Sequence, residues 1–476
     1  MTTSRNYPKP HQRRFSWGIL LGLLFLLGVG SAVAVAWGVY DRIGRTPVEV
    51  LDYLERRLQG HNKLEWAAEP MLNLLREKLD APRAAERARR FVVPAPPRRR
   101  GAEAVLAPDL LSPGATVWRV GPGEAIVRIA DAAQRAKDGD VVEIVAGDYH
   151  GDVAIWKQKR LTIRGVGGAA RLFADGRSAE GKAIWVIRHG DFNISNIDFI
   201  GTRVNDRNGA GIRFEGGNLL LRHCLFWGNQ MGLMTSGSAR DANATLRIES
   251  SEFAYSAVKD RWGHNLYVGG IGMLSVTGSY FHHAGVGHLL KSRARVNDIR
   301  YNRFTDESGG RASYELNFPN GGDVRLVGNI VQQQSSTENG KMISFGEEGY
   351  GRQPNTLQMA SNTFVNDHPY GGTFVYVEPG ADSVLSANNL RVGRGTDSIT
   401  DSMTVVNDHR SDWTKFRHPA RHDYTLRGSP SALRYQPLVG TALKGLIPAA
   451  RYVHPTTVEQ FQAPPMFVGA DPWVNE

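Results

Sequence analysis

A repeat of short apolar segments fills the middle of the chain and limits its possible folds more than any other feature. Each unit holds a strand-like segment that ends at an aromatic or aliphatic anchor residue. Successive anchors are 27, 27, 28, 23, 26, 34 and 26 residues apart. The anchors are Phe199, Phe226, Phe253, Phe281, Phe304, Ile330, Phe364 and Leu390. A period in the twenties without helical segments predicts a solenoid whose stacked coils bury one continuous core.

A second strand recurs between the anchors, and the alternation of side chains along a strand predicts its two faces. The predicted inward column is Ile212, Leu233, Leu266, Leu289, Tyr314, Ile343 and Val375. The predicted outward column is Arg213, Met234, Tyr267, Leu290, Glu315, Ser344 and Tyr376. Asn and Gly residues just before the anchors are expected to form tight corners, because both tolerate left-handed backbone.

Two segments flank the repeat. DGDVVEIVAGDY at Asp138–Tyr149 and HDYTLRGSPSAL at His422–Leu433 resemble the first coil and the closing segment of the pectin-lyase-like superfamily. The resemblance covers roughly Ala115 to Ala432 and implies an all-β, right-handed parallel β-helix. We therefore expect a β-helix domain at 115–433 and a Pro-rich C-terminal tail at 434–476, which packs along the solenoid or hangs free.

The beginning of the chain predicts a membrane anchor. A basic tail at 1–16 precedes 24 uncharged residues at 17–40, and about 20 residues suffice to cross a bilayer as a helix. Positive residues before the span place the N-terminus in the cytoplasm. We expect a single-pass protein of the bacterial inner membrane, with its C-terminal domain in the periplasm. The alternative is a signal peptide cleaved after Ala34-Val-Ala36.

Between the anchor and the repeat the sequence predicts a helical stalk at 41–93 and a Pro/Arg-rich linker at 94–114. Leu residues recur at helical spacing in Pro47–Leu58 and in Leu64–Leu79, which is typical of an amphipathic helix. The apolar stripe of this stalk could join two copies of the chain, or lie on the main domain or the membrane.

Charge and cysteine content exclude several function classes. The net charge is +10, but residues 1–110 hold 18 Lys+Arg and 11 Asp+Glu, so only +3 remains for the other 366 residues. The basic balance therefore does not mark a nucleic-acid groove. Cys224 is the single cysteine, so an intrachain disulfide is impossible. No zinc pattern, phosphate loop or nucleophile elbow is present.

The polar residues most suited to chemistry gather around Ala284–Asn317. Strands of neighbouring coils lie about 4.8 Å apart, so residues of three consecutive coils can converge on one surface. The predicted patch consists of Arg261, His264, Asn265, Tyr267, His288, Lys291, Arg293, Glu315 and Asn317. Its mixture of charge and aromatic rings in a shallow groove suits an extended polymer better than a small metabolite.

An acidic polysaccharide gives these residue types a mechanism. β-Elimination from a uronate needs a group that neutralises the sugar carboxylate, a base, and a donor to the leaving oxygen. The candidate catalytic residues are Lys291, Arg293, His288 and Tyr267. The candidate substrate-binding residues are Arg261, His264, Asn265, Glu315 and Asn317.

The order of motifs around Lys291-Ser292 supports a more specific comparison. This pair is followed by Asn302, by Gly309-Gly310 and by the strand Ser313–Asn317. The order resembles the chondroitinase B and alginate lyase family, in which a parallel β-helix carries a catalytic Lys followed by Ser. The resemblance implies that Lys291 is the base. The family's catalytic Arg has no clear match, because Glu315 stands near that place.

The sequence thus predicts a protein that binds an acidic polysaccharide and cleaves or epimerises it. The rival prediction is a non-catalytic scaffold of the cell envelope, for carbohydrate binding or assembly. No cofactor is required by the pattern. Glu347, Glu348 and Asp367 offer the oxygen ligands that Ca²⁺ prefers, but solvated carboxylates are the simpler interpretation.

Overall fold

The structure, a computed structural model, describes residues 91–99, 114–236, 242–257, 263–337, 339–351, 354–368, 371–399 and 403–472, with positions 70, 72, 74, 75 and 78. The chain divides into two units, Met1–Pro82 and Arg83–Glu476. The five described positions of the first unit are helical. The expected anchor at 17–40 lies outside the described residues. Among the residues that are described, no helix is long and apolar enough to span a bilayer.

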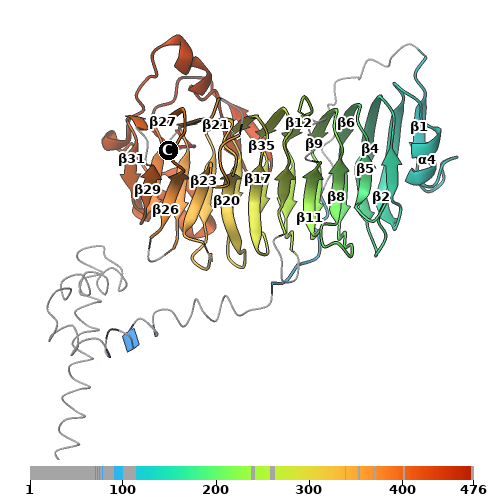
Figure 1. Cartoon of the computed structure of the whole chain (residues 1–476), viewed down its shortest axis with the longest axis horizontal. Coiled ribbons are helices and arrows are strands. Elements are labelled where there is room, and N and C mark those ends of the chain that lie inside the picture. The colour runs from blue at the N-terminus through green and yellow to red at the C-terminus, as the bar shows by residue number, and fades with distance from the viewer. Residues whose placement is uncertain are drawn as a thin grey trace, which may run out of the picture. The chain divides into compact units, whose positions relative to one another are not determined.

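The second unit is a parallel β-solenoid in which a typical coil contributes three strands (Figure 1). Strands at equivalent places in successive coils pair in parallel and build three faces. The first and second faces belong to one 21-stranded sheet, and the third face is a separate 10-stranded sheet. The all-β solenoid predicted from the repeat is confirmed.

The bounds of the strands follow the repeat. The first face contains β1 (Val117–Val120), β2 (Val141–His150), β4 (Arg160–Phe173), β6 (Asp191–Ser195), β9 (Asn218–Arg222), β12 (Thr245–Glu249), β15 (Met273–Thr277), β18 (Val296–Arg300), β21 (Asp323–Val327), β24 (Thr356–Ala360), β27 (Ser383–Ala387) and β30 (Met403–Val406). The second face contains β7 (Ile197–Ile200), β10 (Leu225–Trp227), β13 (Glu252–Ala254), β16 (Tyr280–His282), β19 (Arg303–Thr305), β22 (Ile330–Gln333), β25 (Thr363–Asn366), β28 (Leu390–Gly393) and β31 (His409–Ser411). The third face contains β3 (Ala154–Trp156), β5 (Ala183–Ile187), β8 (Ala210–Phe214), β11 (Met231–Thr235), β14 (Leu266–Val268), β17 (Gly287–Ser292), β20 (Ala312–Phe318), β23 (Lys341–Phe345), β26 (Thr373–Val377) and β29 (Thr396–Ile399).

A short helix, α4 (Ile129–Arg135), lies between β1 and β2 at the start of the solenoid (Figure 1). Asp152 accepts hydrogen bonds from the first helical N–H groups, at 2.6 Å from Ile129 N and 3.0 Å from Ala130 N. Gln158 donates to carbonyls at the other end of the helix. Both ends of α4 are therefore satisfied by the coil beneath, which lets the helix close the open end of the core.

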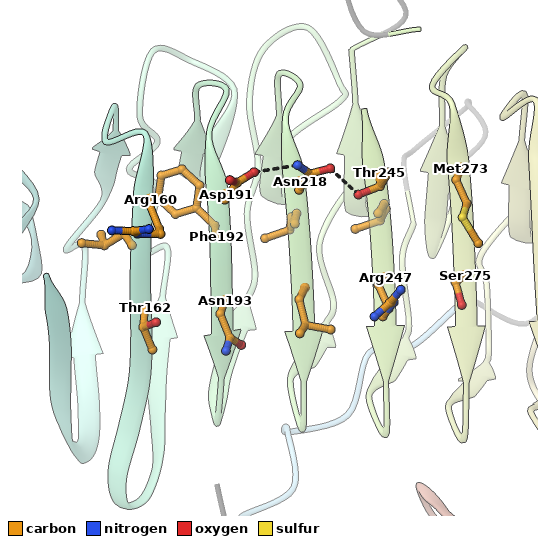
Figure 2. A pocket seen from close by; sticks show the side chains of 14 residues that line it. Arg160, Thr162, Asp191, Phe192, Asn193, Asn218, Thr245, Arg247, Met273 and Ser275 are labelled. Atoms are coloured by element: carbon orange, nitrogen blue, oxygen red, sulfur yellow. Dashed lines mark hydrogen bonds between the residues drawn. The ribbon is translucent and has the colours of Figure 1, made fainter. Parts of the chain in front are cut away.

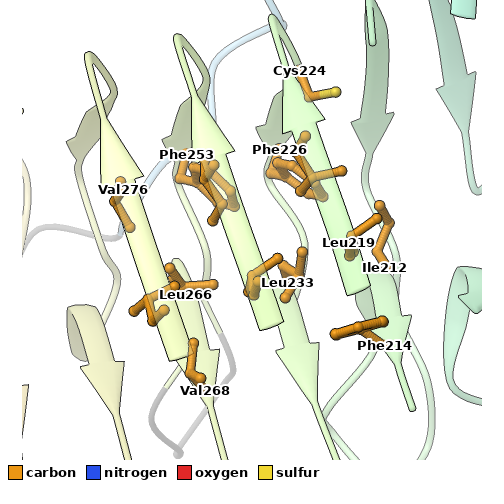
Figure 3. Close-up of a cluster of buried hydrophobic side chains, with 14 of the residues drawn as sticks. Ile212, Phe214, Leu219, Cys224, Phe226, Leu233, Phe253, Leu266, Val268 and Val276 are labelled. Atoms are coloured by element: carbon orange, nitrogen blue, oxygen red, sulfur yellow. The ribbon is translucent and has the colours of Figure 1, made fainter. Parts of the chain in front are cut away.

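Aromatic rings stack along the core at the spacing of the coils. The ring centroids of Phe199, Phe226, Phe253, Phe281 and Phe304 are 5.0, 4.4, 4.7 and 4.8 Å apart in that order. Figure 3 shows Phe226 and Phe253 facing Leu233 and Leu266 across the interior. These rings are fully buried, so each anchor contributes both apolar burial and offset stacking.

A ladder of buried amides runs along the corner between the first and second faces. The side-chain oxygen of Asn329 accepts from the backbone and side-chain nitrogens of Asn302, both at 3.0 Å, and that of Asn362 accepts from Asn329. Asn389 continues the ladder, which ends on the carboxylate of Asp408. The expected left-handed Asn and Gly residues before the anchors are found at Asn196, Gly278, Gly328 and Asn388, but the ladder asparagines themselves are not left-handed. The left-handed residue is the one just before each of them, and the amide itself points inward.

Two predicted anchors are displaced by one residue. Phe304 pairs with Val331, and Phe364 pairs with Arg391, so Ile330 and Leu390 lie in the neighbouring outward column. Leu390 is buried and Ile330 partly buried beneath the C-terminal tail. These two residues are apolar because the tail covers them. In the sequence repeat, a residue covered by the tail looks the same as a residue in the core.

The register of the third face also differs from the prediction. Leu266 pairs with Leu290, and Leu290 pairs with Leu316, so the inward column does not continue through Leu289 and Tyr314. A bulge after Gly287 shifts the pairing of β17 with β20. Shifting the register of a strand by one residue exchanges its two faces. For β17 this exchange brings Lys291 into the outward column in place of Leu290. In β20, Asn317 occupies that column in place of Glu315, which is fully buried although alternation gives these two residues the same face.

Two segments outside the coils pack on the solenoid. In the segment 91–99, the carbonyl of Pro94 accepts from Trp227 Nε1 at 2.8 Å, and Arg99 pairs with the buried Asp198 of the second face. The tail contains η2 (Trp413–Lys415), β32 (Phe416–His418), η3 (Pro419–Arg421), β33 (Asp423–Leu426), η4 (Ser431–Leu433), η5 (Thr441–Leu446), β34 (Ala450–Val453) and β35 (Thr457–Gln460). Phe416 and Phe467 of the tail bury Leu390 and Val392. The tail thus packs along the solenoid, one of the two expected arrangements.

Replacing Asn329 by Ala is expected to lower the free energy of unfolding by roughly 2–4 kcal/mol, because it leaves buried groups of the adjacent coils without partners. Urea unfolding of the full chain measures the change. The control is Asn205→Ala at an exposed turn, expected within about 0.5 kcal/mol of wild type. Equal effects of the two substitutions would show that the ladder does not stabilise the coils.

Candidate functional site

The outward column of the third face gathers polar and aromatic side chains from successive coils. By register it contains Met234, Tyr267, Lys291, Asn317, Ser344 and Tyr376. The members from Tyr267 to Ser344, together with the residues that contact them from adjoining turns, are called the third-face patch below. The predicted convergence of neighbouring coils is found here, although with a corrected register.

One carboxylate bridges two cations in the third-face patch. Glu348 Oε1 lies 2.8 Å from Lys291 Nζ, and Glu348 Oε2 lies 2.7 Å from Arg293 Nη2. Arg293 also donates to the side-chain oxygen of Asn320, and its Nε lies 3.4 Å from the Tyr267 hydroxyl. Burial opposes the charged form of Glu348, but these hydrogen bonds and charges outweigh it and lower the pKa of Glu348.

The turn that carries this carboxylate is held by the preceding coil. The N–H of Glu348 donates to the carbonyl of Pro319 at 2.8 Å, and Asn320 Nδ2 donates to the carbonyl of Gly349 at 3.0 Å. The side chain of Glu348 is nevertheless 46% exposed, whereas that of Lys291 is 9% exposed. The carboxylate is therefore the accessible member of the ion pair, and the ammonium lies below it.

A second carboxylate, Glu347, forms a parallel network beside the first. It accepts from Lys341 Nζ at 2.6 Å, from the Tyr314 hydroxyl at 2.7 Å and from Ser344 at 2.8 Å. Lys341 Nζ also lies 3.8 Å above the ring of Tyr376. Burial opposes ionisation of Glu347, yet the net effect of its three hydrogen-bonding partners is a lowered pKa.

Two neutral histidines lie behind the first network. His264 and His288 have ring centroids 4.6 Å apart, and the backbone N–H of His288 donates to His264 Nδ1 at 3.0 Å. Burial, reinforced by the charges of Lys291 and Arg293, lowers the pKa of His264 to about 3. Burial also lowers the pKa of His288, whose Nδ1 has no partner among the described residues. A His288 that is only 5% exposed is poorly placed to reach a polymer on the surface.

The remaining predicted site residues have other places. Asn265 is buried and bonds to the backbone of Phe253, Ser256 and His282, which makes it part of a corner. Glu315 is fully buried inside the solenoid, so its expected contact with substrate is wrong. Asn317 lies in the outward column at 3% exposure, and Arg261 falls outside the described residues.

Sequence reasoning did not assign several residues of the patch. Tyr314 and Ser344 were predicted only as members of the inward and outward columns, and Asn320, Lys341, Glu347 and Glu348 were not placed in the predicted patch. Glu347 and Glu348 were interpreted as solvated carboxylates, with calcium binding as the alternative, whereas each pairs with a lysine. The sequence feature that could have pointed to them is a pair of adjacent carboxylates directly after a strand of the repeat, one coil beyond Asn317. Among the described residues, no group of three or more His, Cys, Asp or Glu side chains could hold a metal ion.

A separate pocket of about 420 Å³ lies on the first face (Figure 2). Asn218 donates to Asp191 at 2.6 Å and accepts from Thr245 at 2.6 Å, so these three side chains form a chain across its strands. Arg160 and Arg247 are exposed at its wall. None of the predicted site residues lines this pocket. The pocket is therefore a separate surface, and a substitution in it can serve as a control for substitutions in the third-face patch.

Comparisons with known proteins leave the family open. No family model matches the chain, and no curated protein matches it. Among solved structures, a chain described as Geobacillus virus E2 - ORF18 is similar at 12% sequence identity and a TM-score of 0.33. The alignment covers 60% of this chain and 55% of that chain. At this TM-score the similarity carries no argument about fold or function.

The lowered pKa of His264, about 3 in the folded chain, predicts a pH dependence of stability. The unfolded chain binds a proton as pH falls through about 6.5, while folded His264 stays neutral. Stability is therefore lost between pH 6.5 and pH 3, at no more than about 1.4 kcal/mol per pH unit. His264→Gln should reduce the decline in unfolding free energy between pH 7 and pH 5 by about 1–2 kcal/mol.

The control for this measurement is His189→Asn, which changes an exposed histidine on a left-handed turn. That variant should show the decline of the wild-type protein. Urea unfolding at the two pH values gives both numbers. An identical decline in His264→Gln and wild type would contradict a neutral, buried His264.

Proposed function

We propose that the solenoid binds an acidic polysaccharide along its third face. The observation that carries the proposal is the Glu348 carboxylate, which bridges Lys291 and Arg293 from an exposed turn. A ligand carboxylate has the same charge and shape. It can therefore take the place of Glu348 and receive the same charge-assisted hydrogen bonds.

Exchange of one carboxylate for another need not be costly. The pair is worth more than a surface ion pair, because the Lys291 ammonium is only 9% exposed and loses its partner if Glu348 leaves alone, so the ligand carboxylate has to bind Lys291 as Glu348 leaves. Each charge-assisted hydrogen bond to a ligand held in a groove contributes roughly 1.5–3 kcal/mol. A ligand that replaces Glu348 and also contacts neighbouring coils can thus compensate for the opened pair.

The arrangement of the patch favours a polymer over a small ligand. Successive outward residues belong to strands about 4.8 Å apart along the solenoid axis. Tyr267, Lys291, Asn317 and Ser344 belong to four consecutive coils, but Lys291 and Asn317 are nearly buried and Ser344 is fully buried. An extended chain that lies along the axis can therefore contact Tyr267 and Arg293, which are partly exposed, and it reaches Lys291 only by taking the place of Glu348.

Cleavage by β-elimination is the second candidate, and one contact favours it. Tyr267 lies next to Arg293, so a phenol that can protonate a leaving oxygen accompanies a cation that can neutralise a carboxylate. Lys291 is the proposed base, as the family resemblance implies, and it must first lose Glu348 as a partner. Epimerisation begins with removal of the same proton. Binding without reaction corresponds to the scaffold of the cell envelope.

We also propose the location, on the sequence alone. Residues 17–40 anchor the chain in the inner membrane, the solenoid faces the periplasm, and the stalk at 41–93 is available for self-association. The full chain should remain with membranes after alkaline carbonate extraction, whereas a chain that lacks residues 1–40 should be released. Detection of a mature N-terminus at Trp37 would contradict a retained anchor.

The binding proposal predicts opposite effects of neighbouring substitutions. Lys291→Ala and Arg293→Ala should each weaken binding to alginate or pectate about tenfold, because each removes a charge-assisted hydrogen bond. Glu348→Gln should strengthen binding severalfold, because it removes the carboxylate that competes with the ligand. Affinity is measured on the full chain at low and at high salt, and higher salt should reduce it.

The matched control is Arg160→Ala, which removes a cation from the pocket on the first face and should leave affinity unchanged. The same incubations report β-elimination through the ultraviolet absorbance of an unsaturated product. Loss of that signal in Lys291→Ala supports the lyase candidate. Weaker binding in Arg160→Ala with wild-type binding in Lys291→Ala would move the polymer to the first face and contradict the proposal.

A further inference from the structure

Two carboxyl groups lie together inside the solenoid, beneath the third face. Asp306 follows β19 and Glu315 belongs to β20, and both side chains are fully buried. Asp306 Oδ2 accepts from the N–H of Ala312 at 2.6 Å. Gln333 Nε2, from the next coil, lies 3.5 Å from Glu315 Oε2 and donates to the carbonyl of Asn339 at 3.0 Å. Three side chains from two coils therefore meet in the interior.

Each of these three side chains leaves one oxygen without a partner among the described residues. The oxygens are Asp306 Oδ1, Glu315 Oε1 and Gln333 Oε1. Gln333 is fully buried, like the two acids. An unpartnered polar atom in a protein interior costs free energy, and a native structure ordinarily explains such an atom by a bound water or ion.

The charge of the group is not balanced by the protein. Among the described residues, neither Asp306 nor Glu315 forms an ion pair with a Lys, Arg or His, in contrast to Glu347 and Glu348 just outside. Burial raises the pKa of both carboxyls. A neighbouring acid raises each pKa further: Glu307 acts on Asp306, and Asp306 acts on Glu315. The pair therefore needs two positive charges from elsewhere to be ionised at neutral pH.

We propose that Asp306, Glu315 and Gln333 form an internal site for a divalent cation of the calcium class. Two carboxylates balance the charge of a divalent cation, and the amide oxygen of the glutamine adds an uncharged ligand. All three are oxygen donors, which calcium prefers. No nitrogen or sulfur ligand is present, which disfavours zinc and copper. The site joins two successive coils through β20, the strand that also carries Asn317, so an ion there stiffens this part of the third face.

The loop between Asp306 and Ala312 is shaped to hold the carboxylate. A Cβ at Gly310 would lie 2.3 Å from Asp306 Oδ1 and 1.9 Å from the backbone oxygen of Asp306. Only glycine lets the chain close so tightly over this acid. The site is thus built by a specific backbone conformation in addition to its side chains.

The test uses the full chain, purified and then treated with EDTA. Elemental analysis before treatment should find about one calcium per chain in addition to any in buffer. Addition of calcium chloride to the EDTA-treated protein should raise Tm by a few degrees, because an ion that binds only the folded state stabilises it. Magnesium at equal concentration should raise Tm less, since it demands a smaller and more regular shell.

Glu315→Gln keeps the size of the side chain but removes one charge, and it should abolish the rise of Tm with calcium. Glu249→Gln, at a surface ion pair of the first face, should keep that rise. Absence of both bound calcium and a calcium-dependent Tm in the wild-type protein would overturn the site, even if Glu315→Gln fails to fold. An undiminished calcium response in Glu315→Gln would overturn it as well, and would leave protons as the counter-charge of the buried pair.

Discussion

The buried ladder of amide side chains fixes the stacking of the coils, and the rest of the structure depends on it. Asn329, Asn362 and Asn389 each accept from the backbone and the side-chain nitrogen of the asparagine in the coil before, and Asn302 accepts from the backbone N–H of Ser279. Asp408 ends the series and forms an ion pair with Arg391. An amide that slipped by one residue would lose its partners in a dry interior. The corner between the first and second faces therefore holds one register across these coils.

The coils differ in length mainly in the segments on either side of the third face, away from the ladder. The connection from the first to the second face is short in every coil from β6 onward, whereas the segments before and after the third face differ in length from coil to coil. The turn with Glu347 and Glu348 is one such segment. A rigid ladder thus supports a variable surface, which is how a repetitive fold acquires a specific site.

The sequence predicted the solenoid well because burial and stacking repeat in every coil. Phe199 to Phe304 stack as expected, since an aromatic residue at a constant place in each coil has one simple explanation. Ile330 and Leu390 were misplaced, because a residue covered by the tail is as apolar as one in the core. Glu315 was misplaced because it is fully buried, although alternation from the outward Asn317, two residues further on, gives both residues the same face. Glu348, the carboxylate that pairs with both Lys291 and Arg293, lies 57 and 55 residues away from them in sequence, beyond any local pattern.

Hydrogen–deuterium exchange of the full chain, with and without a saturating polyuronate, tests the central proposal most directly. Binding at the third face should slow exchange in the turns at 318–322 and 346–351, which hold Asn320 and Glu348, and should leave the strands around Arg160 and Arg247 unchanged. Slower exchange confined to the first face, or no change in either turn at saturation, would contradict the assignment of the third face as the polymer-binding surface.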